Sequence, residues 1–409
     1  MKAKIQLILL VLFVCVTMRG NDFVMLTPLD TASLPAIPTK DYGVNVVCSL
    51  MNNDAMWQGS LKKLERQDFS TDAIAHVLKT LYRHVHKHYV TFPVAYWSST
   101  PQGDSLLVSG RVYLPKRRYL NGIVVANHYT ICSDAEAPSR IFGMESMFTM
   151  KGYAVIMPDY VGYGASREEL HPYLHWRSAA QTAVDLLDCM PAVLDYYGYS
   201  YPSDVVIEGY SQGGAVALGV ARLLEEKGDE TMWTIRKLYA GAGPYDPAAT
   251  YEYCVELDTM RIPATLSMIV MGLSDAYDLG FELEDFFYEP LVSNYDEWVG
   301  SKLYSVSQIN ELMGSTCMSE LMTAESLDLN QPLAEMLYEA LSWNSNVGYD
   351  LQAPAYFFHS VTDEVVPFVN SLRLAEEMPD DIDVIYDFGD YGSHIAASIP
   401  FMQYVYQDL

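Results

Sequence analysis

The segment 209–213, with the sequence GYSQG, is the feature that most constrains how this chain can fold. It follows an apolar run at residues 205–207 and precedes an alanine- and leucine-rich run at residues 215–224, which is typical of strand, tight turn and helix. The two glycines that flank Ser211 allow a turn sharp enough to lift its hydroxyl above a sheet. The helix that follows would direct its first N–H groups toward developing negative charge. The segment predicts a nucleophilic Ser211, with a plain Gly/Ser turn as the alternative.

A serine hydroxyl is a weak nucleophile, so Ser211 requires a base that is itself oriented by an acid. Only His359 and His394 follow Ser211 among the nine histidines. His394 lies in a glycine-containing loop just after an apolar run, and it is the predicted base. Asp363 lies in a polar loop after the apolar run 355–358 and is the predicted acid. The interval between these two leaves room for a helix and a strand, as expected for consecutive loops at one edge of a parallel sheet.

The other acidic and basic candidates in this region are weaker. Asp387 and Asp390 lie too close to the predicted base in sequence to come from a separate loop. His359 lies inside a predicted strand. It is interpreted as a histidine whose ring nitrogens are hydrogen-bonded in the core or beside the site. Glu364, next to the predicted acid, is expected to point away.

Attack by a serine hydroxyl on a carbonyl group creates an oxyanion, which two N–H donors are needed to stabilise. The first is predicted to be the backbone of Gln212, directly after Ser211. The second is expected in the loop after the apolar run 122–127, where Thr130 is the first choice and Tyr129 the second. The Thr130 hydroxyl could also reach the oxyanion. Neither a metal nor an organic cofactor is expected to take part.

Several motifs resemble the α/β-hydrolase superfamily and, more narrowly, its secretory lipase and esterase group. They are GYSQGG at 209–214, VTDEVVP at 361–367, GSH at 392–394, PDYVGYG at 158–164 and HPY at 171–173. The resemblance extends over residues 90–400 and is thin between 247 and 350. It implies an α/β-hydrolase fold with a mostly parallel central sheet, helices on both faces and a helical cap insertion. One difference is Tyr129, which stands after His128 where many relatives carry glycine. A tyrosine cannot cheaply adopt a conformation that favours glycine, and His128 itself is interpreted as a loop anchor.

Alternating patterns along the chain agree with this fold. Residues 90–97 and 106–114 flank a Pro-Gln-Gly-Asp turn and predict an antiparallel hairpin. The strands predicted for the parallel sheet are 123–127, 154–157, 205–208, 237–240, 355–358 and 383–386. Helical patterns without a convincing strand fill residues 247–350, which predicts a helical insertion that packs mainly on itself and turns some apolar side chains toward an acyl site.

The organisation predicted along the chain has five parts. They are a signal peptide at 1–20, an N-terminal wrapping segment with a helix at 21–88, the first part of the hydrolase core at 89–246, the helical cap or lid at 247–350, and the second part of the core at 351–409.

Residues 1–20 combine two lysines, an apolar run and a small final residue, which predicts a secretory signal peptide and a secreted or periplasmic protein. The apolar run is too short for a membrane span, so no integral membrane association is expected. Lipid anchoring at Cys15 is not expected, because Val14 stands where such a signal has a small residue.

The net charge and the cysteine spacing argue against a nucleic-acid-binding protein and against a zinc protein. A formal net charge of −27 excludes nucleic-acid binding through general electrostatics. Five cysteines follow residue 20, widely spaced and without a C-x-x-C motif, so no zinc site and at least one free thiol are expected. The histidine-rich segment 84–88 is interpreted as basic surface rather than a metal site.

These features together predict a secreted serine hydrolase that cleaves carboxylic esters through a Ser-His-Asp triad and an acyl-enzyme intermediate. The substrate is expected to be a small-molecule, lipid or acylated-carbohydrate ester, and its acyl length stays open, as does the oligomeric state. The first alternative is a serine peptidase resembling the prolyl oligopeptidase family, which is disfavoured because an N-terminal propeller domain has no room. The second is a non-catalytic hydrolase-fold binding protein, which is disfavoured because such proteins usually lack part of the triad.

Overall fold

A nine-stranded sheet forms the centre of the structure, a computed structural model that describes residues 24–26, 89–141, 143–378 and 383–409. The strands lie in the order β1-β2-β3-β5-β4-β6-β7-β8-β9. Strand β3 pairs antiparallel with β2 and with β5, and all other neighbouring pairs are parallel. The predicted mostly parallel sheet is confirmed. The strands are β1 (Val24–Leu26), β2 (Tyr89–Ser99), β3 (Ser105–Pro115), β4 (Gly122–Asn127), β5 (Tyr153–Pro158), β6 (Asp204–Tyr210), β7 (Thr234–Gly241), β8 (Ala355–Ser360) and β9 (Val384–Gly389).

Each apolar run predicted as a parallel strand forms one, and these are β4 to β9. Every residue of β4, β5 and β8 is buried, which explains why these strands are continuously apolar rather than alternating. The largest differences are in β7, which begins at Thr234, before the predicted start at residue 237, and in β9, which continues to Gly389, beyond the predicted end at residue 386. The predicted hairpin is β2-β3, and its turn is closed by the N–H of Gly103, which donates to the carbonyl of Thr100 at 3.0 Å.

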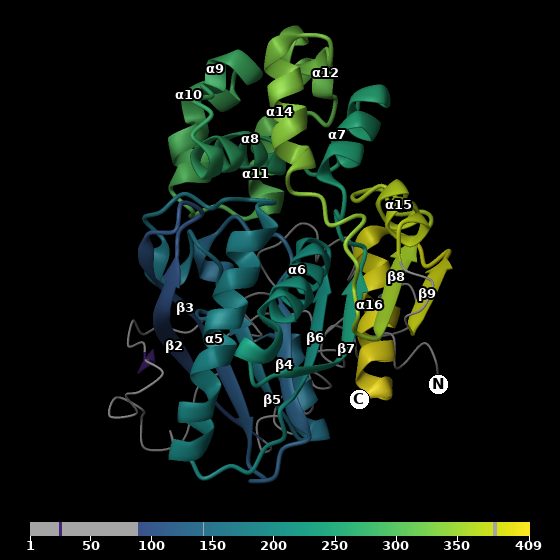
Figure 1. Ribbon diagram of the computed structural model, residues 1–409. Helices are drawn as coiled ribbons and strands as arrows, with labels where there is room; N and C mark the ends of the chain where they lie inside the picture. The colour runs from purple at the N-terminus through teal and green to yellow at the C-terminus, as the bar shows by residue number, and fades with distance from the viewer. Residues whose placement is uncertain (1–23, 27–88, 142, 379–382) are drawn as a thin grey trace, which may run out of the picture.

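Helices cover both faces of the sheet (Figure 1). Helices α5 (Trp176–Tyr196) and α6 (Gln212–Lys227) bury their apolar sides in one core cluster with β4, β5 and β6. The opposite face carries the short helix η2 (Met144–Lys151) and the C-terminal helix α16 (His394–Asp408), which share a second cluster with the sheet. Helix α15 (Val369–Glu376) connects β8 to β9. This three-layer arrangement is the predicted one.

Between β7 and β8 the chain forms short helices that we call the helical insertion. They are α7 (Pro247–Glu256), α8 (Ala264–Tyr277), α9 (Leu283–Phe286), α10 (Leu291–Tyr295), η5 (Asp296–Gly300), α11 (Val306–Met313), α12 (Met318–Leu321), α13 (Ala324–Leu327) and α14 (Pro332–Ser342). In Figure 1 they stand together beyond the carboxyl ends of β6 and β7. They have their own apolar core, which also takes in Cys132 and Tyr173 from loops at the carboxyl end of the sheet. Most of the methionine and phenylalanine side chains of this segment are buried in that cluster, whereas Tyr288 and Met336 are exposed.

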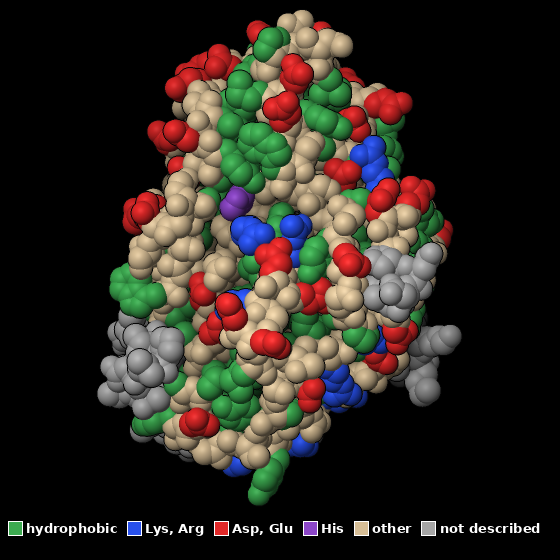
Figure 2. Space-filling view, viewed as in Figure 1, with side chains coloured by type: hydrophobic (Ala, Val, Ile, Leu, Met, Phe, Trp, Pro, Cys, Tyr) green, Lys and Arg blue, Asp and Glu red, His purple; other side chains and the backbone are tan. Residues whose placement is uncertain are grey.

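Some predictions fall outside the described residues: the signal peptide, the N-terminal helix, the histidine-rich segment 84–88, and Cys15 and Cys48. The cysteines in the described part are free thiols: Cys132, Cys189, Cys254 and Cys317. Within residues 89–141, 143–378 and 383–409, no set of three His, Cys, Asp or Glu side chains is arranged to hold a metal ion. None of the helices described is both long enough and apolar enough to cross a membrane. Acidic side chains are spread over the face seen in Figure 2, on the helical insertion and on the core alike.

Candidate active site

The turn after β6 has a backbone that only small flanking residues permit. Ser211 adopts φ 60° and ψ −129°, a conformation that costs free energy for any residue with a side chain. A Cβ added to Gly209 would lie 2.0 Å from the carbonyl oxygen of Gly213, and one added to Gly213 would lie 2.0 Å from that of Asn127. The Ser211 N–H donates to the carbonyl of Gly241 at 2.9 Å, which ties the turn to β7. The G-x-S-x-G sequence is therefore required by the close approach of three backbone segments.

We expect Gly213→Ala to destabilise the fold by about 3 kcal/mol, because the methyl group has no space beside the end of β4. Denaturant unfolding followed by circular dichroism measures the effect. Gly300→Ala is the matched control, since the nearest atom to its added Cβ is 3.6 Å away; its effect should stay within about 0.5 kcal/mol. Equal stability of both variants would contradict the steric account of the turn.

Three of the predicted site residues come together at the carboxyl end of the sheet. The Nε2 atom of His394 lies 2.9 Å from the Oγ atom of Ser211, and its Nδ1 atom lies 2.6 Å from Oδ2 of Asp363. Ser211 and His394 are each 7% exposed. Because Nδ1 faces a carboxylate, it carries the ring proton of the neutral imidazole, which leaves Nε2 free to accept the Ser211 proton. The side chains therefore form one chain of hydrogen bonds from serine to aspartate.

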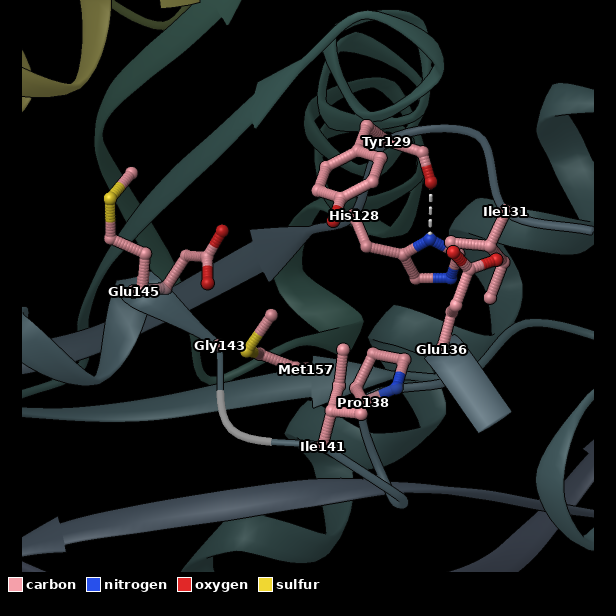
Figure 3. A pocket seen from close by; sticks show the side chains of 10 residues that line it. His128, Tyr129, Ile131, Glu136, Pro138, Ile141, Gly143, Glu145 and Met157 are labelled. Atoms are coloured by element: carbon pink, nitrogen blue, oxygen red, sulfur yellow. Dashed lines mark hydrogen bonds between the residues drawn. The ribbon is translucent and has the colours of Figure 1, made fainter. Parts of the chain in front are cut away.

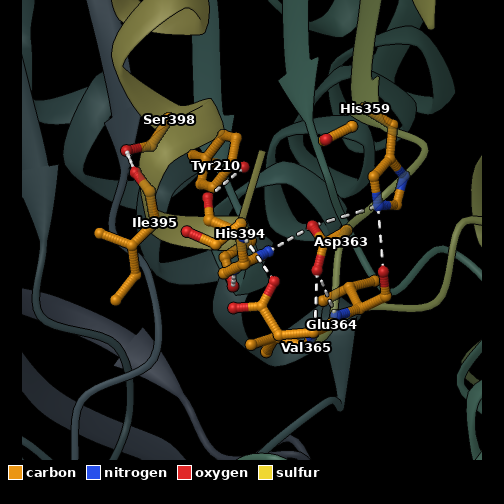
Figure 4. A network of polar contacts seen from close by, with 12 residues as sticks. Tyr210, His359, Asp363, Glu364, Val365, His394, Ile395 and Ser398 are labelled. Atoms are coloured by element: carbon orange, nitrogen blue, oxygen red, sulfur yellow. Dashed lines mark hydrogen bonds and ion pairs between the residues drawn. The ribbon is translucent and has the colours of Figure 1, made fainter. Parts of the chain in front are cut away.

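The carboxylate of Asp363 is buried and held at both oxygens (Figure 4). Oδ1 accepts the backbone N–H groups of Val365 at 2.8 Å and Val366 at 2.9 Å. Oδ2 faces the rings of His394 and His359, at 2.6 Å and 3.4 Å. Burial alone would raise the pKa of Asp363, but the hydrogen bonds from the two histidines lower it far below its ordinary value. Asp363 is therefore ionised at every pH at which the His394 ring is neutral and can act as a base.

The prediction that Glu364 points away from the site is wrong. Its Oε2 atom accepts the backbone N–H of His394 at 3.0 Å, and the Tyr210 hydroxyl donates to the carbonyl of His394 at 2.7 Å. His394 is the first residue of α16, so its N–H has no acceptor within the helix and a carboxylate there is favourable. Nothing in the Asp-Glu pair itself indicates this contact, because it depends on where the next helix begins.

The two acidic residues that were set aside as candidates have other partners. Asp387 accepts hydrogen bonds from the hydroxyl groups of Tyr356 and Tyr391, and Asp390 accepts one from the hydroxyl group of Thr362.

The two predicted oxyanion donors follow the adjacent strands β4 and β6, Thr130 in a loop and Gln212 at the start of a helix. Gln212 is the first residue of α6, so its N–H also has no acceptor within the helix. Its side-chain Nε2 lies 3.2 Å from Nε2 of His171, a contact that the sequence does not indicate. The Thr130 hydroxyl is paired with the Tyr173 hydroxyl at 2.7 Å. The oxyanion roles of Gln212 and Thr130 stay predictions.

His128 has the contacts of a loop anchor. Its ring stacks on that of Tyr160, with centroids 4.0 Å apart, and its Nδ1 atom lies 2.7 Å from the carbonyl of Tyr129 (Figure 3). Burial lowers the pKa of His128 to about 4, so the ring is neutral at physiological pH. Beside it lies a cavity of about 20 Å³, which has room for about one water molecule. This cavity is too small for a substrate.

A larger cavity of about 340 Å³ lies between the core loop around His171 and the helical insertion. Its lining comes from the core loop around His171, the turn around Lys302, and the side chains of Cys132 and Met268. Its size is within the usual range for ligand pockets. Neither this cavity nor the smaller one has Ser211 among its lining residues in the described part of the chain. His171 links the larger cavity to the Ser211 turn through its contact with Gln212.

Comparison with known proteins gives a structural likeness but no match in sequence. No family model matches the chain, and no curated protein matches it. A Legionella pneumophila protein assigned as a hydrolase is 18% identical, with a TM-score of 0.70 over 79% of this chain and 92% of that chain. The rice cell wall degrading esterase LipA from Xanthomonas oryzae is 18% identical, with a TM-score of 0.64 over 78% and 88%. Candida antarctica lipase A in its closed state is 18% identical, with a TM-score of 0.59 over 78% and 77%.

At this level of identity the likeness establishes the fold. The chain has the α/β-hydrolase fold, as its motifs indicated.

Proposed function

We propose that the protein is a serine hydrolase that cleaves carboxylic esters, an esterase or lipase in the broad sense. The observation that carries this proposal is the hydrogen-bond chain from Ser211 through His394 to Asp363, at 2.9 and 2.6 Å. This geometry is the one that activates a serine hydroxyl for acyl transfer. The esterase and the lipase among the structural neighbours support the choice of esters over other acyl compounds. The segment 1–20 supports export from the cytoplasm by a signal peptide.

In the proposed reaction, Ser211 Oγ attacks the ester carbonyl while His394 Nε2 accepts the hydroxyl proton. The Asp363 carboxylate holds the ring and stabilises the imidazolium that forms. The carbonyl oxygen becomes negatively charged and accepts hydrogen bonds from the N–H groups of Gln212 and Thr130. His394 then gives its proton to the departing alcohol oxygen, which leaves the acyl group on Ser211. A water molecule, deprotonated by His394, releases the carboxylic acid and restores the serine.

We also propose that the helical insertion, residues 247–350, acts as a cap over this site. Its support is contact with the loop that follows Thr130. The Sγ atom of Cys132 lies 3.2 Å from the Sδ atom of Met268, and the N–H of Asp134 donates to the carbonyl of Lys302 at 2.9 Å. Movement of the insertion would therefore change access to the site from the side of the oxyanion loop.

Hydrolysis of p-nitrophenyl esters of increasing acyl length tests the proposed function. We expect turnover of at least one ester and covalent labelling of the protein by a fluorophosphonate probe, with peptide p-nitroanilides left intact. A maximum at acetate or butyrate would indicate a small closed pocket, and activity that extends to long chains would indicate a cap that opens. Failure to label, together with no turnover of any ester, would contradict the proposal. Cleavage of the peptide substrates alone would favour the peptidase alternative.

A further inference from the structure

His359 is fully buried at the end of β8, and the proposed reaction does not use it. Its Nε2 atom lies 3.1 Å from the carbonyl oxygen of Val366 and 3.4 Å from Oδ2 of Asp363. Its Nδ1 atom lies 2.7 Å from the hydroxyl oxygen of Ser371. Both neighbours of Nε2 can only accept, so Nε2 carries a proton, and the Ser371 hydroxyl can donate to Nδ1. The contacts therefore assign a tautomer in which the Nε2–H of His359 donates to the carbonyl of Val366 and has Oδ2 of Asp363 as a second, longer neighbour.

As a result, Oδ2 of Asp363 lies between two imidazole rings (Figure 4). One belongs to the proposed base, and the other belongs to a residue on the preceding strand. Oδ1 of the same carboxylate is already held by two backbone N–H groups, those of Val365 and Val366. Asp363 would therefore keep its position without His359. What His359 adds is a donor that spreads the negative charge of the carboxylate and weakens its pull on the proton of the other ring.

We propose that His359 is a positioning residue for the triad, one that limits the proton affinity of His394 by donating to the shared carboxylate oxygen of Asp363. This inference rests on the proposed function. It also agrees with the lowered pKa of Asp363, to which the hydrogen bond from His359 contributes after the opposing effect of burial.

Other ionisable groups lie on the segments around this carboxylate and histidine. Glu364 binds the backbone N–H of His394, Tyr210 binds its carbonyl, and Asp390 binds the hydroxyl of Thr362 on the neighbouring loop. Glu364 and Asp390 are the acidic groups in these contacts. His359 differs from these groups because its ring nitrogen faces the carboxylate of Asp363 itself.

The variants His359→Leu and His359→Gln separate this role from that of a plain core residue. Leucine removes the donor, whereas the glutamine amide can place an N–H near the position of Nε2. We expect the acidic limb of the kcat/KM profile of His359→Leu to move to higher pH. Activity on p-nitrophenyl butyrate should then fall about tenfold at pH 6 and stay within about threefold of the parent enzyme at pH 9. His359→Gln should restore most of the loss at pH 6.

Phe368→Leu is the matched packing control, because the ring of Phe368 stands edge-on to His359 with centroids 5.5 Å apart. This variant disturbs the same part of the core but leaves the N–H of His359 in place. We expect a lower melting temperature and an unmoved acidic limb. A loss of activity in His359→Leu that is equal at pH 6 and pH 9, or is shared by His359→Gln, would overturn the proposal and leave His359 a core residue.

A second measurement tests the inference without turnover. With ¹⁵N-labelled histidine, NMR follows protonation of the His394 ring in the parent protein and in His359→Leu. The midpoint should move upward by about one pH unit in the variant, in line with the tenfold loss of activity at pH 6. An unchanged or lower midpoint would overturn the inference even if the protein hydrolyses esters. If the midpoint differs between the two proteins as expected, but the parent shows neither turnover nor fluorophosphonate labelling, the proposed function alone would be refuted.

Discussion

Replacing Ser211 with alanine is expected to reduce ester hydrolysis by about 10⁶-fold, the loss typical of a serine hydrolase without its nucleophile. The rest of the site should persist, because the turn is held by backbone contacts such as the Ser211 N–H to Gly241. The measurement is kcat on p-nitrophenyl butyrate, with labelling by a fluorophosphonate as the second readout. Retention of more than a small fraction of activity, or labelling of the alanine variant, would show that another residue is the nucleophile.

Ser211→Gly is the companion variant, and it should be equally inactive. Glycine adopts φ 60° without the steric conflict of a Cβ, so the glycine variant should be more stable than the alanine variant by about 1 kcal/mol. Denaturant titrations of both proteins measure this difference. A gain in stability on loss of the side chain would mean that the turn holds Ser211 in a strained conformation for its chemistry. An alanine variant at least as stable as the glycine variant would show that no such strain exists.

The fold and the relative positions of Ser211, Asp363 and His394 could be predicted because local patterns determine them. Each of these residues follows an apolar run, and every such run became a strand of the parallel part of the sheet. Loops at the carboxyl ends of parallel strands share one edge of a sheet, so residues far apart in sequence meet there. The glycines around Ser211 are also a local pattern, and they indicate the sharp turn because the close approach of neighbouring backbone requires them.

The contacts that were missed depend on long-range packing and on where helices begin. Glu364 reaches His394 because α16 starts at that histidine, and a chain position alone does not reveal the start of a helix. His171 meets Gln212 because the loop after β5 folds under the helical insertion. The shape of the cavity beside that loop is set by turns such as the one at Lys302, which has φ 55° without being a glycine. No apolar periodicity encodes contacts of this kind, so the substrate could not be predicted.

Asp363→Asn is expected to lower kcat by about 10⁴-fold through a change of tautomer. The asparagine carbonyl would keep the N–H groups of Val365 and Val366, so its NH₂ group would face His394. Nδ1 of His394 would then accept a hydrogen bond, and its proton would move to Nε2, where it blocks acceptance of the Ser211 proton. The rate constants on p-nitrophenyl butyrate measure the effect, and a loss below about tenfold would show that Asp363 does not orient the base.

The same substitution should change stability in a pH-dependent way. Asp363 is ionised in the folded protein, with a pKa depressed far below the value of about 3.9 expected in the unfolded chain. Its charge therefore stabilises the fold at pH values above about 4, and this contribution disappears as the pH falls toward the folded pKa. The asparagine side chain of the variant would also place its NH₂ group against the Nε2–H of His359, so we expect a loss of about 3 kcal/mol at pH 7. Denaturant unfolding at pH 7 and pH 3 should show the difference between the two proteins shrinking in acid. A difference that is the same at both pH values would mean that the buried charge of Asp363 adds nothing to the stability of the site.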